Sequence, residues 1–274
     1  MIIDAHIHPF KQIPADWVNG AKGAKKEWYQ NVDLSMEGMI HALDEGGVDK
    51  GILLGLKTAK FTISNEEIAD FCKKSNGRFI GFAAVDPTEG EKAIEEMEYA
   101  IKVLGLKGIG EITPPTQFFY PNDESLYPFY ECAEKLGVPV VIHTGGENGG
   151  LIKYSNPIYL DEVASRFKNL TIIAEHMGSF PFGMWFKEAM NVAWKNPNVY
   201  VGIAALKEIE LVDMDLLTKA VKYIGADKIL FGTDYPTEPL CNIKYHVDLV
   251  MNNSKISDSD KEKIMGENMW NLIK

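Results

Sequence analysis

The stretch Met1-Ile2-Ile3-Asp4-Ala5-His6-Ile7-His8 decides which fold this chain adopts. Its apolar start predicts a strand, and His-x-His stands at the end of that strand, where a dinucleotide-binding fold would carry Gly-x-Gly-x-x-Gly. Residues i and i+2 of an extended segment project to the same side, so His6 and His8 aim two imidazoles at one point. The sequence therefore opens on a pair of metal-ligand side chains and not on a nucleotide-binding turn.

Beyond this segment, apolar and β-branched runs recur with amphipathic segments between them. Most runs are continuous in hydrophobicity, which is typical of strands buried on both faces of a parallel sheet. The predicted strands are Ile2–Ala5, Lys50–Leu54, Phe79–Val85, Lys107–Ile112, Pro139–His143, Leu170–His176, Val199–Ala204 and Lys228–Gly232. Alternation of these strands with helices predicts an α/β fold, a closed (β/α)8 TIM barrel, in a single domain over residues 1–274. An open, doubly wound sheet is the alternative.

Capping side chains mark the starts of several predicted helices. Ser35 precedes an apolar stripe, and Ser64 with Glu67 forms a capping box. Asp123 is expected to cap the helix that follows it. These signals predict that a helix begins directly after each of the three capping residues.

The composition argues against several classes of partner. The net charge of −11 argues against nucleic acid, whose binding needs a basic groove. No uninterrupted apolar run reaches about 18 residues, so we expect neither a membrane span nor a membrane partner. Cys72, Cys132 and Cys241 are widely spaced and odd in number, which favours free thiols in a cytoplasmic protein. We expect a small-molecule substrate and leave a homodimer open.

Cationic side chains are few near the expected site. The two arginines, Arg78 and Arg166, are each expected near the N-terminal end of a strand, away from the candidate ligands. Without an arginine fork, a neutral or modestly charged substrate is favoured over a strongly anionic one. Three lysines expected at the rim, Lys57, Lys60 and Lys207, are the alternative partners for a substrate carboxylate.

Residues that ligate metals recur at or near the ends of the later apolar runs. They are Glu111, His143, His176 and Asp234. Parallel barrel strands bring their C-terminal ends to one rim, so these side chains are expected to converge with His6 and His8. Four histidines and two carboxylates suit a borderline divalent cation, most of all Zn²⁺, with one or two ions per chain. The remaining histidines, His41 and His246, lie elsewhere and serve as controls.

Two connections are longer than the ~2–6 residues usual in such units, namely Pro9–Asp33 and Pro114–Asn122. Both follow strands on the ligand face, so we expect both to wall the pocket. The glycine-rich run 145–150 is interpreted as a rim loop because it lacks the lysine of a phosphate loop, and residues 179–185 are expected to add apolar wall. Asp4 is interpreted as a plain strand-start aspartate, with orientation of a histidine as the alternative.

The combined motifs resemble the metal-dependent amidohydrolase superfamily, in its amidohydrolase-related, dihydroorotase-like TIM-barrel branch. Four blocks match in order: Asp-Ala-His-Ile-His-Pro at 4–9, Pro-Val-Val-Ile-His-Thr-Gly at 139–145, Glu-His-Met-Gly at 175–178 and Gly-Thr-Asp-Tyr-Pro at 232–236. The tail at 260–268 resembles the closing helix of that family. The resemblance therefore covers nearly the whole chain.

This resemblance implies a ligand set. It implies that one metal is bound by His6, His8, His143 and Asp234. His176 matches a histidine that binds a second metal in binuclear members or assists catalysis in mononuclear ones. Many binuclear members bridge their metals with a carbamylated lysine on the fourth strand, whereas Gly-Ile-Gly-Glu-Ile resembles the glutamate-bridged pattern of the TatD-type hydrolases. Glu111 is thus either a bridging ligand or a carboxylate that only contacts the ligands.

The activity that the resemblance implies is hydrolysis of an amide, cyclic amide or lactone by a metal-activated water, whose pKa a metal lowers from 15.7 to about 7. Asp234 is expected to act as general base and then acid, and His176 to stabilise the oxyanion if it is not a ligand. The alternative is a non-oxidative decarboxylase of a small unsaturated or aromatic acid, similar to aminocarboxymuconate semialdehyde decarboxylase. A metal-binding protein without catalysis is the third hypothesis. Glu111 and the lack of rim arginines favour hydrolysis.

Overall fold

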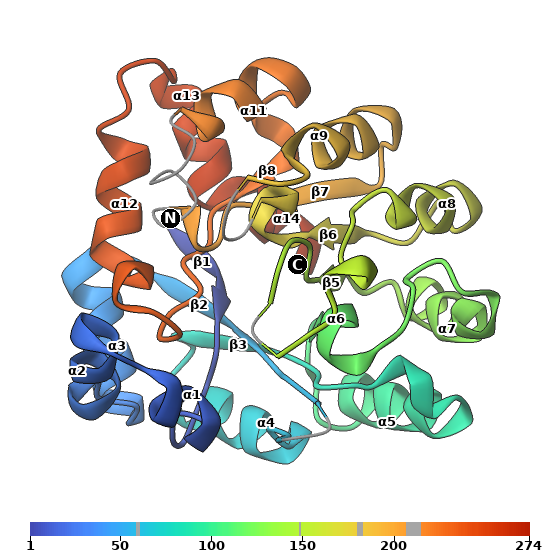
Figure 1. Ribbon diagram of the computed structural model, residues 1–274, viewed down its shortest axis with the longest axis horizontal. Coiled ribbons are helices and arrows are strands. Elements are labelled where there is room, and N and C mark those ends of the chain that lie inside the picture. The colour runs from blue at the N-terminus through green and yellow to red at the C-terminus, as the bar shows by residue number, and fades with distance from the viewer. Residues whose placement is uncertain (59–60, 148, 180–182, 207–214) are drawn as a thin grey trace.

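A computed structural model of the chain describes residues 1–58, 61–147, 149–179, 183–206 and 215–274. The described residues form eight strands, which lie at the centre of the molecule with the helices around them (Figure 1). The strands are β1 Ile3–Ile7, β2 Lys50–Leu54, β3 Phe79–Phe82, β4 Ile109–Ile112, β5 Val140–Ile142, β6 Ile172–Ala174, β7 Val199–Gly202 and β8 Ile229–Leu230. They match the predicted strands one for one and in order.

All neighbouring strands are parallel, and the ladder closes on itself. Continuous pairing gives the orders β1-β2-β3 and β4-β5-β6-β7-β8. A bridge between Ala83 and Ile109 joins β3 to β4, and a bridge between Ile7 and Tyr235 joins β1 to the segment after β8. The fold is therefore the predicted (β/α)8 TIM barrel, because no strand edge is left open at either seam.

Helices connect successive strands and cover the outside of the barrel (Figure 1). The α-helices are α1 Ala15–Gly20, α2 Gly23–Asn31, α3 Met36–Gly46, α4 Asn65–Lys74, α5 Glu91–Lys102, α6 Pro114–Gln117, α7 Tyr127–Leu136, α8 Tyr159–Arg166, α9 Phe186–Lys195, α11 Leu216–Ile224, α12 Ile243–Met251, α13 Asp258–Glu262 and α14 Asn268–Ile273. Short 3₁₀ turns are η1 Pro87–Glu89, η2 Glu124–Leu126, η3 Ile152–Tyr154, η4 Glu175–Gly178, η5 Ala226–Lys228 and η6 Pro239–Cys241, and Lys263–Glu267 (η7) is a π turn.

The predicted helix caps are largely confirmed. The Ser35 side chain accepts a hydrogen bond from the Gly38 amide at the start of α3, and Ser64 and Glu67 form the predicted capping box of α4. Asp123 differs from the prediction, because it caps the short turn η2 (Glu124–Leu126). The helix α7 begins only after this turn, at Tyr127. The reason is local, since Tyr127 and the proline after it begin α7 without a side-chain cap.

Several strands end earlier than predicted on the ligand side of the barrel. The apolar run of β6 extends to His176, but the strand stops at Ala174. The next residues leave extended backbone, because His176 and Met177 adopt φ values of 58° and 52°. Hydrophobicity alone does not reveal such a turn, so the predicted ends of β3, β5, β7 and β8 also lie one to three residues too far along the chain.

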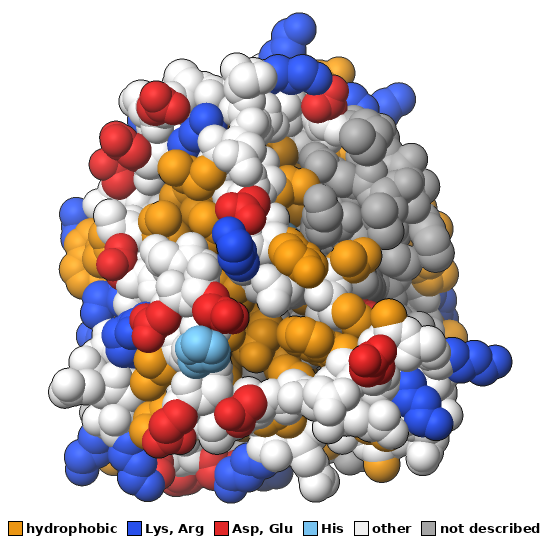
Figure 2. All heavy atoms as spheres, turned by 90° about the vertical axis from the view of Figure 1, so that its left-hand side faces the viewer, with side chains coloured by type: hydrophobic (Ala, Val, Ile, Leu, Met, Phe, Trp, Pro, Cys, Tyr) orange, Lys and Arg blue, Asp and Glu red, His pale blue; other side chains and the backbone are white. Residues whose placement is uncertain are grey.

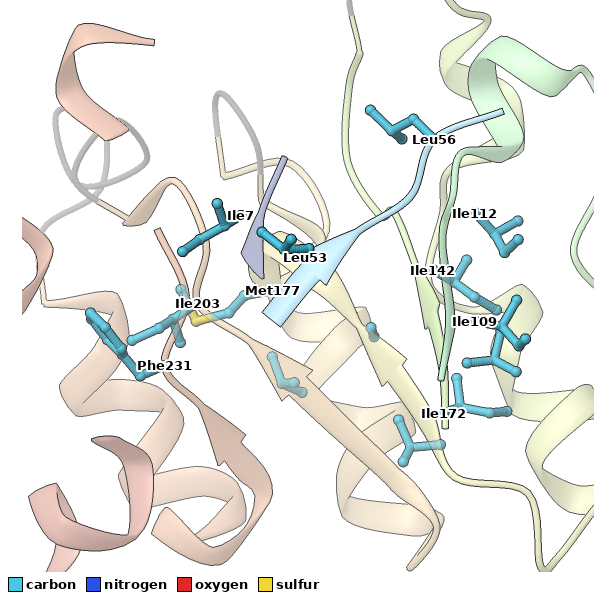
Figure 3. Close-up of a cluster of buried hydrophobic side chains, with 14 of the residues drawn as sticks. Ile7, Leu53, Leu56, Ile109, Ile112, Ile142, Ile172, Met177, Ile203 and Phe231 are labelled. Carbon is cyan, nitrogen blue, oxygen red and sulfur yellow. The ribbon is translucent and has the colours of Figure 1, made fainter. Parts of the chain in front are cut away.

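Apolar side chains form two layers on the two faces of the strands. The outer layer lies between strands and helices, and Figure 3 shows Ile109, Ile142 and Ile172 of neighbouring strands grouped within it. The inner apolar layer fills the barrel, and it consists of Ile3, Ala5, Ile52, Leu54, Phe82, Val141, Ile173, Leu230, Met269 and Ile273. Two of these residues belong to α14, which therefore closes one end of the barrel interior.

The register of β1 contains an irregularity that serves the site. Asp4 pairs with Gly51 while Ile7 pairs with Leu53, so β1 carries one extra residue between these pairs. Ala5 belongs to the inner apolar layer, yet the next residue, His6, also points its imidazole into the barrel. A bulge of this kind changes which side chains face inward, and here it lets a histidine follow an inward alanine directly.

The surface fits the acidic composition. Figure 2 shows the side of the molecule that carries α3 and α12, where acidic side chains border an apolar hollow. That hollow is lined by Trp28, Val32, Ala42 and Tyr235 together with Asp33, Glu37 and Glu45.

Within the described part of the chain, no helix combines the length and the apolar character needed to cross a membrane. Cys72, Cys132 and Cys241, all in that part, form no disulfide with one another.

Candidate metal centre

The candidate ligands predicted from the sequence all lie buried at the ligand end of the barrel. His6 lies in β1 and His8 directly after it, Glu111 lies in β4, His143 follows β5, His176 lies in η4 after β6, and Asp234 lies in the segment after β8. Each is less than a tenth exposed. The controls differ as predicted: the side chain of His41 is exposed, and His246 is buried within α12, where its Nδ1 faces the Asn242 carbonyl oxygen.

His6 and His8 point their Nε2 atoms at one place, 3.1 Å apart. The Nδ1 of His8 lies 3.3 Å from the Leu54 carbonyl oxygen. Because a carbonyl oxygen is an acceptor, this contact is a hydrogen bond when Nδ1 carries the imidazole proton. A proton on Nδ1 leaves the Nε2 lone pair of His8 available to a cation. The pair therefore has the orientation that the His-x-His spacing predicted.

Asp234 completes a first group of three donors. Its Oδ1 lies 3.5 Å from His6 Nε2 and 3.2 Å from His8 Nε2. Asp234 holds a φ of 69°, which is uncommon for a residue other than glycine. The Asp234 amide donates to the His6 carbonyl (2.9 Å), and the Asp234 carbonyl accepts from the Thr237 hydroxyl (2.6 Å). These bonds fix the carboxylate against the two histidines.

Glu111 lies among all four histidines. Its Oε1 lies 3.1 Å from His143 Nδ1 and 3.4 Å from His176 Nε2. Its Oε2 lies 3.5 Å from His6 Nε2 and 3.6 Å from His8 Nε2. A second group of three donors therefore forms from His6, Glu111 and His176, and it shares His6 with the first.

The other two histidines are held by backbone carbonyls. His176 Nδ1 lies 3.0 Å from the Ala204 carbonyl oxygen, which turns its Nε2 toward Glu111. His143 Nε2 lies 3.2 Å from the Gly146 carbonyl oxygen, which leaves Nδ1 as its inward atom. Among the described residues, His143 belongs to neither group of three donors and meets the cluster through Glu111.

The pKa values of His6 and Glu111 are shifted in opposite directions by the charged groups around them. Burial alone would lower the pKa of His6, but the carboxylates of Glu111 and Glu175 raise it well above the ordinary value. Burial would raise the pKa of Glu111, but His6, His143 and His176 lower it well below the ordinary value. Buried carboxylates beside inward imidazole nitrogens are stable only with positive charge among them. The donor set therefore fits a divalent cation.

Glu175 is a site residue that sequence reasoning missed. Its Oε2 lies 3.3 Å from His6 Nδ1, and both residues are fully buried. Within the described chain, neither atom has a hydrogen bond of acceptable geometry. Gly202 on β7 leaves the room, because a β-carbon there would overlap the Glu175 carboxylate. The available signal was a lone carboxylate directly after the apolar run Ile172-Ile173-Ala174.

The interpretation of Asp4 as a plain strand-start aspartate is wrong, because its side chain is buried and accepts three hydrogen bonds. The side chain is fully buried, and burial raises its pKa to about 7. Its Oδ1 accepts hydrogen bonds from the backbone amides of His6 and Thr233, both at 3.1 Å, and its Oδ2 accepts one from the Thr233 hydroxyl at 2.6 Å. Asp4 thus joins the histidine-bearing part of β1 to the segment that carries Asp234.

The long connection after β1 walls the site as predicted, although it forms two helices rather than a loop. The cavity at the cluster is lined from this connection by Trp17, Lys25 and Tyr29. The Tyr29 hydroxyl donates to the Thr237 carbonyl (2.7 Å), which clamps α2 onto the segment after Asp234. The other described lining residues are His8, Leu56, Glu111, His143, Glu147, His176, Asp234, Thr237 and Glu238.

The other predicted walls are only partly tested. No described residue of Pro114–Asn122 lines this cavity, so that prediction is wrong, because the connection packs behind the loop after β5. Contact between the two segments is made by Thr116 and Glu147. Asn148 of the glycine-rich run and residues 180–182 of the predicted apolar wall lie outside the described residues.

Of the three lysines expected at the rim, Lys57 lies among the described residues, and it already forms ion pairs with carboxylates of the protein. Lys57 forms ion pairs of 2.6 Å with both Glu89 and Glu96. Arg78 pairs with Asp44 and Arg166 lies over the Tyr127 ring, both away from the cluster as predicted. Lys60 and Lys207 lie outside the described residues. Lys25, which no sequence signal indicated, lines the cavity and is paired with Glu238.

Comparison with known proteins supplies the family context. A family model described as amidohydrolase matches residues 3–268. The chain is 28% identical over 254 residues to a gamma-resorcylate decarboxylase of Polaromonas sp. (strain JS666), covering 77% of this chain and 75% of the relative. It is 29% identical over 236 residues to a 2-amino-3-carboxymuconate-6-semialdehyde decarboxylase of Dictyostelium discoideum, covering 76% and 65%.

Solved structures share the fold over nearly the full length. An uncharacterised TIM-barrel protein from Bordetella bronchiseptica superposes with a TM-score of 0.79 at 25% identity, covering 99% of this chain and 97% of the other. A dihydroxybenzoic acid decarboxylase from Polaromonas sp. JS666, with bound manganese and 2-nitroresorcinol, gives a TM-score of 0.74 at 22% identity, covering 99% and 96%.

These relatives correct the expected reaction. The named relatives are decarboxylases, so the expectation of amide or lactone hydrolysis is wrong. The ligand set did not distinguish the two reactions, because the same imidazole and carboxylate donors serve both. The lack of arginines did not exclude a carboxylic acid substrate either, because a cation bound at the barrel mouth would attract a carboxylate without them. Zinc stays a prediction, because the structural neighbour holds manganese.

Proposed function

The chain belongs to the amidohydrolase family, and we propose that it is a metal-dependent, non-oxidative decarboxylase of a small unsaturated or aromatic carboxylic acid. The observation that carries the proposal is the buried cluster of four histidines and two carboxylates at the barrel mouth, in a chain whose named relatives are decarboxylases. The aromatic and aliphatic wall made by Trp17, Tyr29 and Leu56 is suited to a flat, partly apolar substrate.

We assign the ligands from the donor geometry. His6, His8 and Asp234 would hold the cation, with Glu111 and His176 as the second group of donors and His143 supporting Glu111. Glu175 would orient His6 through Nδ1, as a carboxylate commonly does behind a metal-bound histidine. When bound, the cation supplies a positive charge that holds and polarises the substrate carboxylate. Imidazole-rich donors suit Zn²⁺ as well as Mn²⁺.

Loss of CO₂ breaks the bond between carboxyl and ring or chain carbon, and that carbon must receive a proton. Burial raises the pKa of Asp234, but hydrogen bonding to His8 and the charge of His6 lower it overall. The resting side chain is thus a carboxylate that lines the cavity, and it would accept the carboxyl proton of a substrate that arrives as the neutral acid. Asp234 would then return that proton to the carbon that CO₂ leaves, while His176, fixed by Ala204, would stay beside the reacting group.

The test is a metal-dependent assay of CO₂ release. Protein reconstituted separately with Zn²⁺ and Mn²⁺ is offered hydroxylated and aminated benzoic acids, with matched lactones and amides as the hydrolysis control. We expect CO₂ release by at least one metal form and no hydrolysis of the control panel. Hydrolysis of a lactone or amide without decarboxylation of any acid would overturn the proposal. Metal analysis of the same samples counts ions per chain and separates one-ion from two-ion loading.

A further inference from the structure

Glu147 lies in the connection after β5, four residues beyond His143, and lines the same cavity as His8 and Asp234. Its backbone carbonyl accepts a hydrogen bond from the Gly150 amide (3.2 Å). The Leu151 amide donates to the Pro115 carbonyl (2.9 Å) and anchors the far end of the same connection. These backbone bonds therefore anchor the connection at Glu147 itself and at Leu151.

The Glu147 carboxylate is poorly satisfied by the protein. Among the described residues, its carboxylate accepts a hydrogen bond from the Thr116 hydroxyl, at 3.4 Å. That hydroxyl has a single hydrogen and a shorter alternative, the Thr113 hydroxyl oxygen at 2.8 Å. A carboxylate offers about four acceptor positions, so the Thr116 hydroxyl leaves most of the capacity of Glu147, which lines the cavity, open to a bound molecule.

The other carboxylates that line the cavity differ from Glu147 in this respect. Glu111 and Asp234 face histidines, and Glu238 is paired with Lys25. No lysine or arginine of the described chain forms an ion pair with Glu147 within 4.0 Å. Burial raises the pKa of Glu147 to about 7, in keeping with a carboxyl group that lacks a strong donor. A partly exposed acceptor that has only a weak donor is available to a donor on a bound molecule.

We propose that Glu147 is a specificity-determining residue that accepts a hydrogen bond from an amino or hydroxyl group of the substrate. The inference rests on the proposed function, because it takes the substrate carboxylate to lie at the metal cluster. It then requires a second polar group on the same molecule, at the side of the cavity formed by the connection after β5. Acids whose group is methylated, and so has no hydrogen to donate, should be discriminated against.

The experiment measures binding and turnover on matched pairs. The probes are the three ring isomers of hydroxybenzoate and aminobenzoate, each compared with its O-methyl or N,N-dimethyl counterpart. Calorimetry on the metal-loaded full chain gives Kd, and CO₂ release gives kcat/KM. For wild type we expect at least one donor acid to bind about 10–100-fold tighter than its methylated counterpart, the range typical of a hydrogen bond to a charged group.

Three variants assign that preference. Glu147→Ala should abolish it and Glu147→Gln should keep part of it, because the amide oxygen still accepts. Glu238→Gln, a lining carboxylate already paired with Lys25, should leave the preference as in wild type. Metal content and thermal midpoint are measured for each variant, so that loss of metal or of folding is not mistaken for loss of recognition.

The outcomes separate the two proposals. Donor-dependent binding that vanishes in Glu147→Ala, without CO₂ release from any acid, would support the recognition site and overturn the decarboxylase. CO₂ release from donor and methylated acids at equal rates would support the decarboxylase and overturn the recognition site. A preference that survives in Glu147→Ala, or no binding by any probe, would also overturn the role of Glu147.

Discussion

The same strands line both ends of the barrel interior, but the side chains at one end are apolar and those at the other end are polar. At one end the inner apolar layer is sealed by Met269 and Ile273 of α14. At the other end, the seven side chains that meet are all polar; they are His6, His8, Glu111, His143, Glu175, His176 and Asp234. Burial stabilises the apolar end without any partner, at about 25 cal/mol per Å² of apolar surface. The polar end is stable only when its charges compensate one another.

The backbone differs between the two ends as well. At the polar end β1 carries its register shift, and His176, Met177 and Asp234 have positive φ values. Residues in such conformations cost on the order of 1–3 kcal/mol each and are usually retained for function. Stability and chemistry are thus separated along the strand axis, and substitutions at the two ends should fail in different assays.

Removing the cation should produce the largest effect and only at the polar end. Dialysis against a chelator is expected to abolish CO₂ release and to lower the thermal midpoint, since a ligand at 100 times its Kd contributes about 2.7 kcal/mol to stability. Readdition of Zn²⁺ or Mn²⁺ should restore both. Turnover that persists in a preparation shown to be metal-free by elemental analysis would contradict the proposed ligands.

Asp234→Asn should be next in size. Asparagine is nearly isosteric but does not take the proton, so we expect kcat to fall roughly 10²–10⁴-fold while the melting behaviour changes little. Steady-state kinetics and metal content are measured on the same sample. If the variant keeps its metal and a near-normal kcat, another residue handles the proton.

Ile3→Ala tests the apolar end on the strand that also carries His6. Ile3 is fully buried in the inner apolar layer, and truncation of such a residue typically costs about 2–5 kcal/mol. Denaturant titration should show that loss, while kcat per metal-loaded chain stays within about twofold of wild type at temperatures where the chain is folded. A variant of normal stability but low kcat would show that the two ends are not separable.

Glu175→Gln should give the smallest effect and sharpens the boundary between the two ends. The residue contacts His6 but not the cavity, so we expect metal affinity to fall roughly 10–100-fold, with kcat at saturating metal nearly unchanged. Competition with a chromogenic chelator measures the affinity. Glu175→Asp should recover part of the lost metal affinity. If wild type and Glu175→Gln bind the metal equally well, Glu175 does not orient His6 and only fills the space beside Gly202.

The sequence was informative where a single physical pattern decides the outcome. Continuous apolar runs predicted all strands in order, and strand-end histidines predicted which side chains meet. Strand ends such as that of β6 were missed, because the left-handed turn at His176 and Met177 follows from packing and not from hydrophobicity. Asp4 and Glu175 were missed because a carboxylate in an apolar run does not reveal which neighbour it meets. Decarboxylation was only the alternative, because the ligand residues alone do not distinguish it from hydrolysis.

The bonds between Asp4 and Thr233 have a consequence for how the chain is made. The two residues are 229 positions apart, so the first strand waits for its second neighbour until almost the whole polypeptide has been synthesised. At about 5–20 residues per second, that delay is roughly 10–50 s. During it, one edge of β1 and the histidines it carries have no partner from the last strand. The first group of donors, His6, His8 and Asp234, is thus completed last, and a chain stalled before that point is left with an open, aggregation-prone edge.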